Sequence, residues 1–253
     1  EERKQAITEQ LMADLRLLLT PEQEALWTRF ERDLRRNATI EEGGLLSGET
    51  VDLVELLDEM GVEGEVRESI WSLEDQYVTE LDRALVRRNE VYDETTNKAF
   101  ERFTAEGFDD MDSVMDFFRE LLGDAMEQAA RVRDINLKYA ATIGRALPPD
   151  QSAEFENRFN ELVFPRVYRA STTDRAFETI LSFEDLSEEQ RGRVLEAKLR
   201  YEQSRERLDA NWARAIAEQE EERDVMRVMG IEPSTEATQE ARTARRDLDR
   251  TSY

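Results

Sequence analysis

The stretch 62–85, VEGEVRESIWSLEDQYVTELDRAL, decides the fold class. Its apolar residues recur at steps of four and three, which places them on one face of a helix: Val62, Val66, Ile70, Leu73, Tyr77, Leu81 and Leu85. After Gly64, neither Gly nor Pro interrupts the chain until Gly107. The pattern therefore predicts a helix of about 40 residues, roughly 60 Å long at 1.5 Å per residue.

The same periodicity extends over most of the chain. A second apolar run goes from Met111 to Ile143, and a third from Ser187 to about Val228. Turn residues predict breaks at 41–48, 107–110, 148–149 and 230–234. We expect shorter helices at 3–18, 21–36, 50–60, 149–163 and 172–182, and a polar tail from 235 that is a loosely attached helix or disordered. No segment alternates with period two, so the sequence predicts an all-α fold of long, amphipathic, antiparallel, coiled-coil-like helices.

Charge and composition exclude several classes of function. The 253 residues include 59 acidic and 35 basic side chains, a net charge of −24, and no His or Cys. Such a surface repels phosphate backbones, and the missing residue types remove the usual triads and zinc sites. No glycine-rich phosphate loop and no membrane-spanning apolar segment are present. We therefore expect no enzyme, cofactor, metal site, nucleic-acid partner or membrane insertion. With only four lysines, the acidity also fits a high-salt habitat or a GC-rich genome.

One helix-start pattern occurs three times, at 19–23 (LTPEQ), 147–151 (LPPDQ) and 186–190 (LSEEQ). Thr20 and Gln23 can form a reciprocal capping box, with Leu19 as the hydrophobic staple before it. Pro148 replaces the hydroxyl in the second copy and weakens its cap, and the third copy restores it. The motif residues are Leu19, Thr20, Gln23, Leu147, Gln151, Leu186, Ser187 and Gln190.

The two halves of the chain align with each other at nearly constant offsets. At an offset of 128, Ala25, Trp27 and Leu34 match Ala153, Phe155 and Leu162. At 124, Val62, Ile70 and Tyr77 match Leu186, Val194 and Tyr201. These matches favour a tandem duplication of a helical-hairpin unit, although any two amphipathic helices can align by chance. We assign 1–125 to the first half, 126–234 to the second, and 235–253 to the tail.

Residues 19–23 resemble the LTXXQ signature of the Spy/CpxP-like periplasmic family, and 147–151 resemble a degenerate second copy. This resemblance implies an all-helical cradle in the cell envelope. It also implies ATP-independent chaperone activity or regulation of the envelope stress response. The chain begins Glu1-Glu2-Arg3-Lys4, which is consistent with a removed signal peptide or a trimmed chain. It departs from the family in being longer and strongly acidic, whereas the chaperone's client-binding surface carries basic residues.

Aromatic residues concentrate just after the repeated helix starts: Trp27, Phe30, Phe155, Phe159, Phe164 and Tyr168. They either pack the helices together or line an apolar groove that binds protein segments. We expect a non-enzymatic envelope protein that binds unfolded or partner proteins through a helical groove. The alternative is a structural or assembly scaffold that forms helical homo-oligomers.

Overall fold

The computed structural model describes residues 2–24, 26–40, 44–105, 111–228 and 230–251. The fold is all-α, 83% helical and without strands in those ranges. The helices are α1 (Glu2–Arg16), α2 (Pro21–Glu24), α3 (Trp27–Ile40), α4 (Leu53–Glu59), α5 (Gly64–Ala105), α6 (Met111–Ala146), α7 (Pro149–Val163), α8 (Pro165–Tyr168), α9 (Thr172–Leu181), α10 (Glu188–Glu221), α11 (Val225–Val228) and α12 (Glu236–Thr251).

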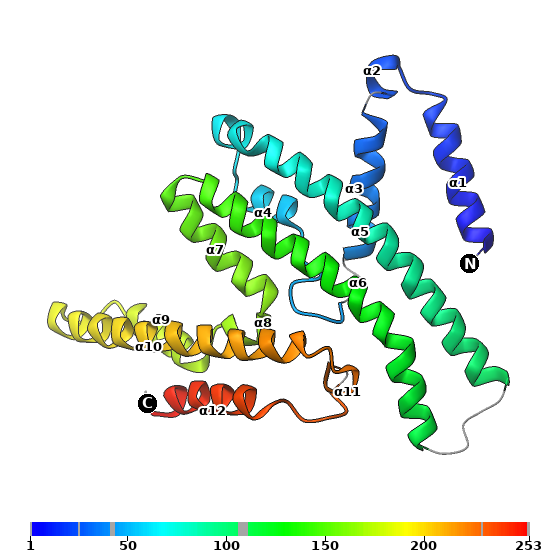
Figure 1. The fold of residues 1–253 in the computed structure, drawn as a ribbon. Coiled ribbons are helices and arrows are strands. Elements are labelled where there is room, and N and C mark those ends of the chain that lie inside the picture. The colour runs from blue at the N-terminus through cyan, green and yellow to red at the C-terminus, as the bar shows by residue number, and fades with distance from the viewer. Residues whose placement is uncertain (1, 25, 41–43, 106–110, 229, 252–253) are drawn as a thin grey trace.

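The α5–α6 hairpin forms the centre of the molecule, with α3 and α7 on its sides (Figure 1). The apolar stripe that predicted α5 packs into the core, with Val66 and Leu73 partly buried and Ile70, Tyr77 and Leu81 fully enclosed. Ile143 of α6 and Phe155 of α7 join them in the main core. Burial of these faces, at about 25 cal/mol per Å² of apolar surface, is the main force that holds the hairpin together.

A short non-helical segment, 44–52, packs against the long helices α5 and α6. Leu46 lies in a second small core with Met126 and Val225, so the segment joins α6 to α11. Gly48 has a φ of +82°, and a Cβ there would lie 3.4 Å from Val163. The positive φ therefore favours glycine at this position, whereas a Cβ there would make only ordinary van der Waals contact with Val163.

The second long pair consists of α10 and α12, which run in antiparallel fashion. The prediction that the third long helix continues to about Val228 is wrong. α10 ends at Glu221, where Arg223 turns the backbone to a φ of +51°. Gly230 does end a helix, with a φ of +74°, but that helix is the short α11. The polar tail is an ordered helix whose Thr238 and Arg245 are buried.

The N-terminal region also differs from the expectation. The single helix expected over 21–36 is divided into α2 and α3. α1 lies apart from the helical body (Figure 1). The boundary assigned between residues 125 and 126 falls inside α6, so the two halves share that helix. The predicted breaks at 41–43 and 107–110 lie outside the described residues.

Candidate functional site

The repeated motifs act as helix starts. The Thr20 amide donates to the Gln23 side-chain oxygen at 2.9 Å, and the Gln23 amide donates to Thr20 Oγ1 at 3.3 Å. Ser187 and Gln190 form the same capping box before α10. Pro148 provides no side-chain cap, as predicted. Leu147 is buried, and Leu19 and Leu186 are half-buried. The Gln151 side-chain oxygen is buried without a hydrogen-bond partner within the described structure.

The six aromatic residues do not share one surface. Trp27, Phe155 and Phe159 are buried, the last two as a stacked pair in the main core. Phe164 and Tyr168 are half-buried. Of this set, only Phe30 is exposed, on α3. Most of the set therefore packs helices together in this structure.

The first half contains a polar cluster around Tyr77 of α5. The Tyr77 hydroxyl accepts from the Leu53 amide at 3.2 Å and donates to Asn136 Oδ1 of α6 at 3.0 Å. It thereby joins the first turn of α4 to both long helices. The Asn136 amide group donates onward to the Gly48 carbonyl at 2.8 Å. Burial raises the pKa of the Tyr77 hydroxyl, and the Asp52 carboxylate beside it raises it further, so the phenol stays protonated.

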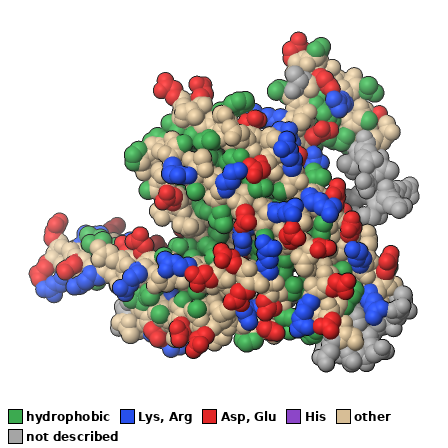
Figure 2. Space-filling view, viewed as in Figure 1, with side chains coloured by type: hydrophobic (Ala, Val, Ile, Leu, Met, Phe, Trp, Pro, Cys, Tyr) green, Lys and Arg blue, Asp and Glu red, His purple; other side chains and the backbone are tan. Residues whose placement is uncertain are grey.

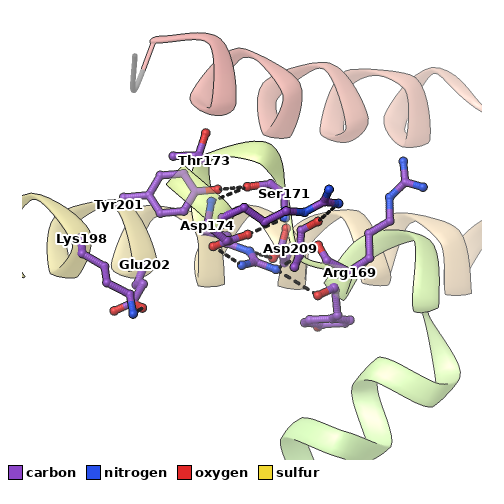
Figure 3. Close-up of polar contacts among 12 residues, drawn as sticks. Arg169, Ser171, Thr173, Asp174, Lys198, Tyr201, Glu202 and Asp209 are labelled. Carbon is purple, nitrogen blue, oxygen red and sulfur yellow. Dashed lines mark hydrogen bonds and ion pairs between the residues drawn. The ribbon is translucent and has the colours of Figure 1, made fainter. Parts of the chain in front are cut away.

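The second half contains a matching cluster around Tyr201 of α10 (Figure 3). The Tyr201 hydroxyl donates to Asp249 Oδ1 of α12 at 2.7 Å. It lies 2.8 Å from Ser171 Oγ, the N-cap of α9. A phenol has one proton, so Ser171 is the donor in that second bond. Tyr201 thus joins a short helix start to a long helix and its returning neighbour, as Tyr77 does.

Beside Tyr201, two arginines converge on one buried carboxylate. Arg245 of α12 donates from Nε to Asp209 Oδ1 at 2.5 Å, and Arg205 of α10 donates to Asp209 Oδ2 at 3.0 Å. Arg205 also pairs with Asp174 of α9 at 2.6 Å. Burial raises the pKa of the Asp209 carboxyl above its usual range, although both arginines oppose that shift. The cluster connects three helices through charge.

A third polar cluster fixes segment 44–52. Glu49 and Arg88 form a fully buried ion pair at 2.9 Å, and Tyr92 donates to the same Glu49 oxygen. Ser47 donates from its amide and hydroxyl to Glu220 at the end of α10, at 3.1 and 2.7 Å. Burial raises the pKa of the Glu220 carboxyl. The segment therefore ties α5 to the end of α10.

None of these clusters was identified from the sequence, except that Tyr77 and Tyr201 were matched by offset. Ser171 and Asp174 carried a usable signal, because Ser followed three residues later by an acidic residue predicts a capping box. The pairing of Asp209 with Arg245 had no such signal, since 37% of the residues in this chain are charged and many helical positions offer an equally good partner.

The largest exposed apolar side chains gather in the N-terminal region. Among the described residues, sixteen large hydrophobic side chains are exposed, and eight of them lie in the first 34 positions. Leu15 is 40% exposed, and the other seven are 41–84% exposed. We call these eight the arm residues: Ile7, Leu11, Leu15, Leu17, Leu18, Leu26, Phe30 and Leu34. Large apolar side chains that are exposed together in one region of a monomer are candidates for a site of interaction.

Two cavities are open to solvent. One, of 420 Å³, lies between the far ends of α5 and α6, and Val91 and Leu121 line it beside Glu94, Lys98 and Asp124. The other, of 340 Å³, lies between α3 and α5, where Arg29 and Arg32 face Glu74 and Asp75. Within the described ranges, no group of three or more acidic side chains could hold a metal ion.

No helix in the described ranges is both long and apolar enough to cross a membrane. The comparisons with known proteins return nothing: no family model, no curated protein and no solved structure matches this chain. The resemblance to the Spy/CpxP-like family therefore rests on the short motifs alone.

Proposed function

We propose that this protein is a non-enzymatic binding protein that holds apolar segments of unfolded or partner proteins on its arm residues. The observation that carries the proposal is the exposure of these eight side chains on α1, directly after α1, directly before α3 and on α3. Their placement replaces the groove of aromatic residues expected from the sequence. Neither a cofactor nor ATP has a role in this function.

The charge distribution supports binding at α1. Residues 2–16 carry three acidic and three basic side chains, so α1 is neutral in a chain of net charge −24. Acidic and basic side chains alternate over much of the face in Figure 2. A helix without net charge that exposes Ile7, Leu11 and Leu15 and lies apart from an acidic body can meet a protein segment without strong repulsion, while the body keeps the protein soluble.

The envelope location and the role in stress response come from the motif resemblance and belong to this proposal. So does the tandem duplication. It is supported by the equivalent connections of Tyr77 and Tyr201, each of which links a short helix start to a long helix and a returning helix.

The test is suppression of aggregation of an unfolding model protein at stoichiometric ratios. The arm variant is Leu11→Ser with Leu15→Ser, whose side chains are 55% and 40% exposed. The matched control is Leu195→Ser with Leu199→Ser on α10, which are 50% and 55% exposed. We expect the wild type and the control to suppress aggregation, and the arm variant to lose most of the effect. Equal activity of all three would contradict the proposal.

The alternative is a structural or assembly protein, and the neutrality of α1 also favours it because copies could meet there. Light scattering over a range of concentrations separates the two functions. A large oligomer or filament that binds no unfolded protein would support the scaffold.

A further inference from the structure

α6 packs against α5, and α12 packs against α10, but the first pair meets through apolar core residues and, in the described ranges, the second does not. α6 contributes Val132, Tyr139 and Ile143 to the main core. In the described structure, α12 contributes no side chain to either core cluster. Its buried side chains are Thr238 and Arg245, and its apolar Ala241 and Leu248 are only half-buried.

Polar contacts hold α12 along its whole length. The Thr235 amide donates to the Gln219 side chain at 2.9 Å, and Thr238 Oγ1 donates to the Ala215 carbonyl at 3.1 Å. Further along, Arg245 pairs with Asp209, and Asp249 accepts from Tyr201. Because a buried ion pair is about as stabilising as a well-packed apolar pair, or less so, a more apolar helix would bind this face of α10 more tightly than α12 does.

We infer that this face of α10 is a helix-binding surface, that α12 is its internal and displaceable occupant, and that it accepts an amphipathic helix from another protein. The partner helix places an arginine against Asp209 and aliphatic side chains where α12 has Thr238 and Ala241. This surface lies in the second half of the chain, and its function does not depend on the arm residues.

Charge selects the partner. The Asp209 side chain is 3% exposed, and Arg205 satisfies only one of its oxygens, at 3.0 Å. The other oxygen is paired with Arg245. A buried carboxylate that loses one partner is strongly unfavourable, so an incoming helix without a cation at this place cannot replace α12.

The aliphatic requirement follows from competition. Because α12 is tethered to α10, it competes for this face at an effective concentration in the millimolar range. A partner can bind only those molecules in which α12 has left α10, so its apparent affinity is its intrinsic affinity multiplied by that fraction of molecules. A partner therefore needs contacts that α12 lacks.

The test uses the full chain and a fluorescent peptide with the sequence of residues 235–251 that carries Thr238→Leu and Ala241→Leu. Arg245→Ala removes the buried anchor, and Arg246→Ala, an exposed neighbour, is the matched control. By fluorescence anisotropy, we expect Arg245→Ala to bind the peptide at least tenfold more tightly than the wild type and the control. Adding Asp209→Asn to Arg245→Ala should abolish that gain. Equal affinity, or no binding, for Arg245→Ala and the wild type overturns the inference.

Hydrogen exchange on the wild type gives a second test that needs no substitution. We expect amides of 239–251 to exchange at least tenfold faster than those of α5 and α6 at 70–85 and 129–143. Protection of α12 equal to that of these core helices would show that it is not displaceable, and would also overturn the inference.

Discussion

The buried ion pair between Glu49 and Arg88 offers the sharpest test of how this fold is held together. The two side chains are 0% and 3% exposed. Arg88 donates to Glu49 at 2.9 Å and to the Thr39 carbonyl at 2.7 Å, so it joins α5 to segment 44–52 and to the end of α3. Replacing it by methionine keeps most of the volume and removes the charge.

The Arg88→Met variant leaves a buried carboxylate with amide and hydroxyl donors but no cation. Breaking a buried pair in this way typically destabilises a protein by about 3–5 kcal/mol. For a chain of this size, 1 kcal/mol shifts the Tm by about 2–4 °C, so the expected fall is roughly 6–20 °C. The neighbouring Arg87→Met removes a side chain that is 54% exposed and that pairs, among the described residues, only with Glu90. It is expected to change stability by about 1 kcal/mol or less.

Urea unfolding followed by circular dichroism measures both variants, and the midpoint should move while the slope stays constant. If Arg88→Met were as stable as Arg87→Met, the pair would contribute little. Segment 44–52 would then be held in place by its apolar contacts, chiefly those of Leu46.

Further predictions address single contacts and solution conditions. Tyr77→Phe removes the hydrogen bonds of the hydroxyl to the Leu53 amide and to Asn136 Oδ1 and leaves those two atoms without this partner, so it should destabilise the protein by about 1–3 kcal/mol in urea. Ser187→Ala removes the α10 cap and should cost about 1 kcal/mol in the same assay. Burial raises the pKa of the Glu220 carboxyl, so the folded state holds this proton more readily than the unfolded chain. That contribution is present at low pH and is lost as the pH rises through the raised pKa, so the Tm of Glu220→Gln relative to wild type should increase from about pH 4 to about pH 7. Added NaCl should raise the wild-type Tm, because screening relieves the self-repulsion of a net charge of −24.

The fold class could be predicted from the sequence because the apolar residues on the buried face of a long helix recur at steps of three and four. Ile70, Tyr77, Leu81 and Leu85 of the predicted stripe are buried in the structure, and the capping boxes at Thr20 and Ser187 form as their spacing predicted. α12 could not be predicted as a packed helix by the same rule. Its buried positions hold Thr238 and Arg245, which periodicity counts as solvent-facing.

The candidate sites were harder to predict than the fold. The aromatic residues were identified, but whether Phe155 faces the core or a groove depends on which helix lies beside it, and sequence spacing does not give that. The arm residues show the converse case. Leu11 and Leu15 form an apolar stripe like those that are buried elsewhere, and only the position of α1 apart from the body leaves them exposed.

The buried charges explain how a chain this poor in apolar residues selects one arrangement of its helices. Amphipathic stripes specify that a helix must be covered, but many helices could cover the same stripe. Arg36 with Asp52, Glu49 with Arg88, and Asp209 with Arg245 each join residues at least 16 positions apart, and the structure satisfies each pair in a single register. A shift of one helical turn, about 5.4 Å, would leave buried ions unpaired. Among these three pairs, the one between Asp209 and Arg245 holds a helix that, in the described structure, contributes no side chain to either core cluster. Charge pairing therefore gives α12 its position while leaving it open to replacement by a better-packed helix.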